Sequence, residues 1–106
     1  MVIDADLRSS PARLKLDEPD DFTSLKVRVH GAPAETDALT GALEPVGTLD
    51  EGGNALLAIA QLRRLAGDRA RDEQWRASFD AMVEYARAKG WVTGDGAHLH
   101  AHCEWQ

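Results

Sequence analysis

The chain has 106 residues, of which 43% are hydrophobic and 28% are charged, a composition typical of one globular domain. Its net charge of −6 argues against a nucleic-acid-binding surface, because phosphate recognition needs clustered Lys and Arg side chains. No apolar run approaches the ~20 residues that a transmembrane helix needs. We therefore expect neither nucleic acid nor a membrane among its partners.

The N-terminal residues lack both the basic start and the apolar segment of a secretory signal. The single cysteine, Cys103, cannot form an internal disulfide. Both observations favour a cytoplasmic protein. Nine Arg against three Lys, with abundant Ala and Gly, is typical of a high-GC bacterial genome.

Residues 1–21 are expected to be a lead-in that is flexible or pairs at a sheet edge. Pro11 and the acidic stretch around Pro19 interrupt regular structure, and the short alternation at 13–16 would suit an edge strand. The remaining residues, 22–106, are then expected to form a single α+β domain.

The segment 22–30 is predicted to be a strand, because apolar residues alternate there with Lys26, Arg28 and His30. Pro33 suits the first turn of a helix, and apolar residues then recur at helical spacing. A helix is therefore expected over 33–44.

The secondary structure of residues 48–67 is ambiguous. A turn is expected at 50–53, after which 54–59 reads either as a buried strand or as the start of a helix capped by Asn54. Ala and Leu favour the helix, whereas the paired glycines of the turn favour a hairpin. We prefer a strand to about residue 59, followed by a short helix over 60–66.

The clearest helix is predicted over 72–89. Apolar residues recur there at steps of three and four and form one stripe, namely Trp75, Phe79, Met82, Val83 and Ala86. Gly90 follows at the position of a left-handed C-terminal cap, and Trp91 is expected to pack back on Tyr85 or Ala86. A short strand at 91–93 and a turn at 94–96 should come next.

The last segment, 97–105, alternates apolar and polar residues without a break and is predicted to be a half-buried strand. Its apolar face carries Ala97, Leu99, Ala101, Cys103 and Trp105. Its polar face carries His98, His100, His102 and Glu104. Most of the residues able to do acid–base or metal chemistry therefore lie on one strand face.

This element order predicts a ferredoxin-like split βαβ sandwich, an antiparallel sheet with helices on one face. The strands at 22–30 and 97–105 would be antiparallel neighbours, which would gather all four histidines on one open surface. Such a surface meets water, a ligand or a partner. A homodimer is expected, and two such faces could pair as in a dimeric α+β barrel.

Three hypotheses for this surface stay open. The leading one is a small binding or accessory protein that uses the open face for a small ligand or protein partner, with His30, Arg28 and Trp105 as ligand-binding residues. The alternative is a cofactor-free isomerase, cyclase or monooxygenase in which His98, His100, His102 and Glu104 perform acid–base catalysis.

The third hypothesis is divalent-metal binding. His98 and His102 start about 13 Å apart along a strand, so only an adjacent pair of histidines can share one ion. We therefore assign neither a metal site nor a cofactor. A polar face that is only solvated is equally compatible with the alternation.

Overall fold

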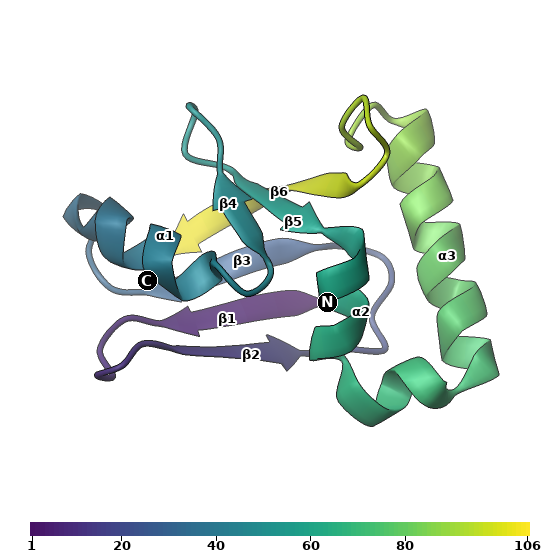
Figure 1. Ribbon diagram of the computed structural model, residues 1–106, viewed down its shortest axis with the longest axis horizontal. Helices are drawn as coiled ribbons and strands as arrows, with labels where there is room; N and C mark the ends of the chain where they lie inside the picture. Colours follow the sequence, from purple (N-terminus) through teal and green to yellow (C-terminus); the bar gives the residue numbers. More distant parts are fainter.

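A six-stranded mixed sheet, in the order β2-β1-β3-β6-β5-β4, forms the centre of the computed structural model, which describes residues 1–106 (Figure 1). The strands are β1 (Val2–Asp6), β2 (Arg13–Asp17), β3 (Lys26–His30), β4 (Gly47–Leu49), β5 (Ala55–Ala58) and β6 (His98–Trp105). The helices are α1 (Thr36–Leu43), α2 (Ile59–Leu65) and α3 (Glu73–Ala88), with 3-10 turns η1 (Pro33–Glu35) and η2 (Gly67–Arg71). The predicted α+β class is confirmed.

The prediction of an antiparallel sheet is wrong. β1 runs parallel to β3, and β3 runs parallel to β6, whereas the β1–β2, β4–β5 and β5–β6 pairs are antiparallel. The chain between β3 and β6 is a long crossover that contains all three α-helices, so it can return to the same end of the sheet. The ferredoxin-like arrangement and the dimeric barrel are not confirmed.

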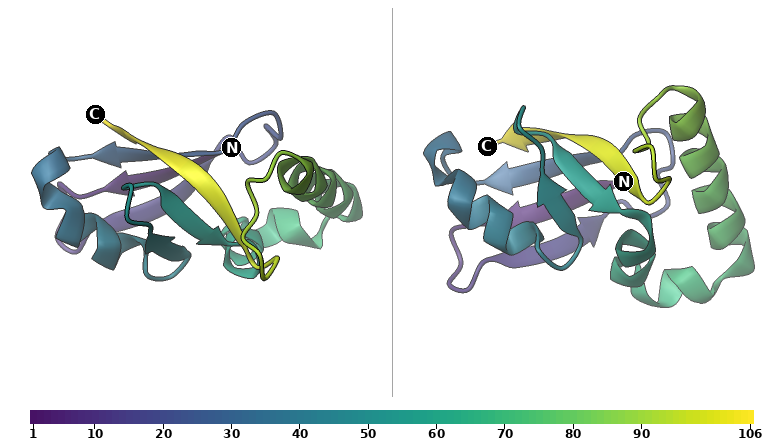
Figure 2. Two further views of the ribbon diagram at one scale, coloured as in Figure 1. Left: turned by 90° about the horizontal axis from the view of Figure 1, so that it is seen from above. Right: turned by 45° about the horizontal axis from the view of Figure 1, so that its top comes forward.

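β6 changes partners halfway along its length. His98–Ala101 pairs with β5, while His102–Trp105 pairs with β3, and the strand crosses the sheet obliquely (Figure 2). The other edge of the first half is covered by the residues before it, because the His100 N–H donates to the Trp91 carbonyl at 2.8 Å. This exchange of partners curls the sheet. The turn predicted at 94–96 is present, whereas the strand predicted at 91–93 is reduced to a single bridge between Val92 and Leu99.

The segment predicted as a lead-in supplies two strands. β2 is the edge strand, but β1 lies inside the sheet between β2 and β3. Ile3 and Ala5 of β1 are fully buried in the same apolar core as the rest of the chain. Residues 1–21 are thus part of the sheet that carries the polar side chains described below.

The helices cover the apolar side of the sheet. α1 and α2 lie in front of the strands in Figure 1, and α3 stands along one end. Each contributes fully buried side chains, such as Leu39 from α1, Leu62 from α2 and Phe79 from α3. The opposite side of the sheet has no helix over it.

The hairpin β4–β5 confirms the strand interpretation of 54–59. Its first residue must be small, because a Cβ atom on Gly47 would lie 2.0 Å from the Leu56 carbonyl oxygen. α2 then begins at Ile59, one residue before the predicted start.

The predicted α3 is confirmed, including both ends. The Asp72 side chain accepts a hydrogen bond from the Gln74 N–H at 2.9 Å, as an N-cap does. Gly90 has φ +80°, and the Trp91 N–H donates to the Ala86 carbonyl at 2.9 Å, which completes a Schellman motif. With 16 residues and a polar outer face, α3 is the longest helix, and none of the helices could span a bilayer.

Candidate functional site

Polar side chains gather on the side of the sheet without helices, here called the polar face. Successive side chains of a strand point to opposite sides of the sheet, so every second residue of each strand lies on this face. The registers between neighbouring strands place these residues side by side. The polar face consists of Asp4, Asp6, Arg13, Lys15, Asp17, Lys26, Arg28, His30, His98, His100, His102 and Glu104.

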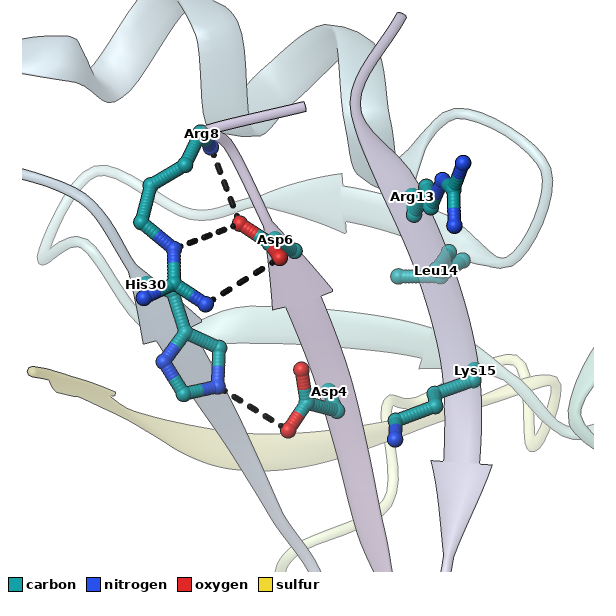
Figure 3. Close-up of a pocket in the computed structure, with 7 residues that line it drawn as sticks. All are labelled: Asp4, Asp6, Arg8, Arg13, Leu14, Lys15 and His30. Carbon is teal, nitrogen blue, oxygen red and sulfur yellow. Dashed lines mark hydrogen bonds and ion pairs between the residues drawn. The ribbon is translucent and has the colours of Figure 1, made fainter. Parts of the chain in front are cut away.

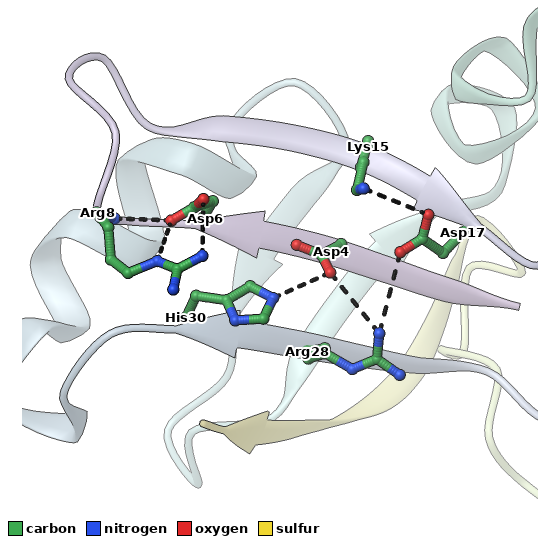
Figure 4. Close-up of polar contacts among 7 residues, drawn as sticks. All are labelled: Asp4, Asp6, Arg8, Lys15, Asp17, Arg28 and His30. Atoms are coloured by element: carbon green, nitrogen blue, oxygen red, sulfur yellow. Dashed lines mark hydrogen bonds and ion pairs between the residues drawn. The ribbon is translucent and has the colours of Figure 1, made fainter.

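Asp4 is the centre of the hydrogen-bonded part of this face (Figure 4). It is the only buried charged residue of the chain, with 7% of its surface exposed. Its Oδ2 atom lies 3.0 Å from His30 Nε2 and 3.7 Å from an Arg28 guanidinium nitrogen. A carboxylate so far from water needs such partners, because burying an unpaired charge is very costly.

A second carboxylate, Asp6, is held by Arg8 just beyond the end of β1. The Arg8 guanidinium donates to both carboxylate oxygens, at 3.0 and 3.2 Å, and the Arg8 backbone N–H adds a third bond at 2.9 Å. These bonds stabilise the ionised form and lower the pKa of Asp6 to about 2. The same contacts raise the pKa of Arg8.

The remaining pairs lie nearer the other end of the strands. Asp17 lies 3.7 Å from Lys15 and 3.9 Å from Arg28, so the cations of two strands share it. Lys26 and Glu104 are 3.1 Å apart across the β3–β6 boundary. These pairs are longer or more exposed than the contacts of Asp4, and each contributes at most about 1 kcal/mol.

A depression of about 480 Å³ opens above this network, over β1 and β2. Figure 3 shows the side chains that surround it, namely Asp4, Asp6, Arg8, Arg13, Leu14, Lys15 and His30. Both of its aspartates already have cationic or imidazole partners, whereas Arg13 has no ion-pair partner. Free positive charge therefore remains at this site, on a protein whose net charge is −6.

The histidines predicted as catalytic lie in a row along β6 and share no common partner. His98 is half-buried and lies 4.0 Å from Asp95, whereas His100 and His102 are exposed. Glu104, predicted to orient an imidazole, is paired with Lys26 instead. No three His, Cys, Asp or Glu side chains converge on a point where they could bind one metal ion.

His30 shares the polar face with these histidines but stands apart from them. Lys26 is opposite His102 in the parallel β3–β6 pair, so His30 lies four residues further along, or about 13 Å away. The four histidines therefore share one side of the sheet, as predicted, but the predicted antiparallel pairing of their strands is wrong and His30 stays apart from the others. The cause of this separation is the strand direction, since antiparallel pairing was assumed.

The other two predicted ligand residues lie on opposite sides of the sheet. Arg28 faces Asp4 and Asp17 within the network. Trp105 is half-buried against the apolar core, on the same side as Cys103. Burial raises the pKa of the Cys103 thiol, which is consistent with a packing role.

A smaller groove of about 80 Å³ lies between α3, the β2–β3 connection and β6. Tyr85 and Trp91, the only large apolar side chains that are exposed, line it at 59% and 50% exposure. Their rings meet edge to face at 6.1 Å, and His100 lies beside them.

Sequence reasoning missed Asp4, Asp6 and Arg8, because residues 1–21 were interpreted as a lead-in. The signal was present: Ile3 and Ala5 alternate with the two aspartates in the period of a half-buried strand. A run of only five residues, without neighbours to indicate its pairing, could not show that its aspartates would meet His30 and Arg28.

Comparisons with known proteins add no assignment to this geometry. No family model matches the chain, and no curated protein and no solved structure is significantly similar to it.

Proposed function

We propose that this protein is a binding protein for a small anionic ligand, which occupies the depression on the polar face beside His30. The observation that carries the proposal is the pairing of charges around it. Asp4 and Asp6 are neutralised by His30, Arg28 and Arg8, while the neighbouring Arg13 lacks a carboxylate partner.

The ligand chemistry follows from the unpaired Arg13 and from Lys15, whose only partner is Asp17 at 3.7 Å. Arg13 offers a planar guanidinium suited to a carboxylate or phosphate group, and Lys15 adds a second cation to the same depression. An anion placed there gains charge-assisted hydrogen bonds, which are about twice as strong as neutral ones. A cationic ligand would instead compete with Arg8, Arg28 and His30 for carboxylates that are already satisfied.

His30 would orient the ligand. With its Nε2–H donated to Asp4 at 3.0 Å, the imidazole is held in one orientation and its other nitrogen stays available. The neutral ring would accept a hydrogen bond at that nitrogen, and the protonated ring would donate one to the anion.

Binding is favoured over catalysis by the composition of the depression, whose lining contains no Ser, Thr or Cys that could act as a nucleophile. A cofactor-free acid–base enzyme remains the second candidate, because an aspartate that holds an imidazole can support proton transfer. A second copy covering the polar face, as in a dimeric α+β barrel, also stays a prediction.

The test is a titration of ¹⁵N-labelled protein with inorganic phosphate and, separately, with citrate, at constant ionic strength. We expect saturable shifts confined to the amides around the depression. Arg13→Gln and Lys15→Gln should each weaken binding, by roughly tenfold, the loss typical of one charge-assisted hydrogen bond.

Arg71→Gln is the matched control, because Arg71 lies on the distant η2 and contacts only the exposed Asp68. It removes the same charge and should leave binding unchanged. Shifts that are spread over the surface, fail to saturate, or weaken equally in Arg71→Gln would show non-specific attraction and overturn the proposal.

A further inference from the structure

The outer edge of β2 has no neighbour, although the strand is regular over all five residues, Arg13–Asp17. Its backbone N–H and C=O groups on that side are available to another strand. The other edge strand, β4, has only three residues, which makes it the poorer template. The outer edge of β2 is thus the longest unpaired edge of the sheet.

We propose that β2 pairs antiparallel with β2 of a second copy, around a two-fold axis at Lys15, so that one continuous sheet runs through both chains. The strand is self-complementary in this register. Arg13 lies opposite Asp17 of the second copy, and Leu14 lies opposite its Leu16. By symmetry each of these favourable pairs occurs twice.

The neighbouring registers are worse. An alternative register must move the partner strand by two residues, because a move by one residue would place the polar side chains of one strand beside the apolar side chains of the other. A shift toward the C-terminal end would pair Lys15 with Asp17 twice, but it would place Leu14 opposite Glu18, which has φ +50°, and Arg13 opposite Pro19, which has no N–H. Regular pairing would then be limited to residues 15–17. A shift the other way would place Arg13 opposite Lys15, with like charges in contact twice.

The chosen register has one unfavourable contact, Lys15 against Lys15 on the axis. Each ammonium group lies 3.7 Å from Asp17 of its own strand, which offsets part of the repulsion. The two side chains are long and mostly exposed, so they can also turn apart. Two Arg–Asp and two Leu–Leu pairs against a single Lys–Lys contact leave the register favourable.

The pairing does not need a bound anion, but it engages Arg13, which also lines the proposed anion site. Anion titrations are therefore made at protein concentrations at which the chain is monomeric, so that the two proposals can fail separately. Lys15→Gln should weaken anion binding because it removes a donor. The same change should tighten the dimer, because it removes the like charges on the axis.

A disulfide trap tests the axis directly. Residues directly opposite in an antiparallel pair have Cα atoms about 4.5–5.5 Å apart, within the range of a disulfide. Lys15→Cys should therefore give a crosslinked dimer under mild oxidation, read on a non-reducing gel, while the buried native Cys103 stays unreacted. Arg13→Cys is the matched control on the same strand, because its two copies would lie about 13 Å apart and should crosslink far less. Equal crosslinking of both variants would contradict the register.

A charge-exchange experiment tests the pairs without a new covalent bond. Arg13→Asp and Asp17→Arg should each weaken the dimer, by roughly tenfold, because two attractive pairs become repulsive. An equimolar mixture of the two variants should dimerise again as a heterodimer, since both pairs between positions 13 and 17 are then Arg opposite Asp. Sedimentation velocity measures the fraction of dimer in the two variants and in their mixture. A variant that had merely lost its fold would not regain dimer on mixing, so recovery identifies the charge pairs as the cause.

A short edge contact implies a weak dimer, so the wild-type protein should be measured up to concentrations on the order of 1 mM. A monomer at that concentration would overturn the proposal. So would a dimer that neither substitution weakens, as expected if the groove at Tyr85 and Trp91 were the interface instead.

Discussion

The two sides of the sheet are built from the same alternating strands, yet different forces hold them. The apolar side packs Phe79, Leu57 and Leu99 together with the helices and excludes water. The polar side holds one buried carboxylate, Asp4, within a set of exposed or half-exposed ion pairs. The first side should therefore set most of the stability of the protein, while the second carries the site proposed above to bind an anion.

The difference also separates residues that tolerate change from those that do not. Removing a buried side chain costs transfer free energy and leaves a cavity, whereas removing an exposed partner of an ion pair costs little. Asp4 is the exception on the polar side, because burial gives a polar residue the sensitivity of a core residue. The predictions below test this ranking.

Phe79→Ala should have the largest effect. Phe79 is fully buried and stacks on Trp75 with 5.1 Å between ring centroids. We expect the free energy of unfolding to fall by about 3–5 kcal/mol in urea titrations. Tyr85→Ala, on the same helix but 59% exposed, should cost less than about 1.5 kcal/mol. Similar losses in the two variants would show that α3 does not pack as described.

Asp4→Asn should have the next largest effect. We expect the free energy of unfolding to fall by about 1–3 kcal/mol, because His30 and Arg28 lose the carboxylate that both contact. Urea denaturation of Asp4→Asn and of Asp6→Asn measures how much stability each of the two carboxylates contributes. Asp6 is also paired but lies nearer to solvent, so Asp6→Asn should lower the free energy of unfolding by less than Asp4→Asn does. If Asp6→Asn proved the more damaging change, burial would not be what distinguishes the two carboxylates.

Gly90→Ala should cost about 1–2 kcal/mol, because φ is +80° there and a Cβ atom disfavours that conformation. Gly94→Ala is the control, since Gly94 has no positive φ and a Cβ atom there would meet nothing within 4 Å. The melting temperatures of both variants, measured by thermal unfolding, test whether the positive φ of Gly90 is the cause. An equal loss at the two positions would contradict the Schellman cap.

The smallest effect concerns the titration of Asp6. Its pKa of about 2 lies below the ordinary 3.8 because of Arg8, so its contribution to stability is complete above pH 3.8 and is lost as the pH falls toward 2. NMR titration of the carboxyl carbon should give the low value in the wild type. Arg8→Gln should return it toward 3.8. An unchanged value in that variant would assign the shift to another neighbour.

The long periodic elements could be predicted from the sequence. The spacing of Trp75, Phe79 and Val83 indicated α3, and Gly90 indicated its end, because both depend only on residues a few positions apart. The alternation in β6 likewise placed Leu99 and Cys103 inward and the histidines outward. Local steric and hydrophobic rules suffice for such features.

The composition of the candidate site could be predicted only in part. His30 and Arg28 were assigned to ligand binding from the alternation of β3, but Asp4, which holds them both, lies 24 residues from Arg28 in a segment that looked irregular. Nothing local distinguishes a five-residue strand inside a sheet from an extended terminus. The burial of Ile3 and Ala5 against the rest of the core decides it.

The sequence by itself determined which residues face solvent on the long periodic elements α3 and β6, because the periods of strands and helices are intrinsic to the backbone. Only the tertiary structure decided which polar residues meet. The long crossover from β3 to β6 makes those strands parallel, which separates His30 from the other histidines, and β1 enters beside β3 to bring Asp4 to His30. Strand order and direction depend on the packing of the whole chain, and they position the candidate site.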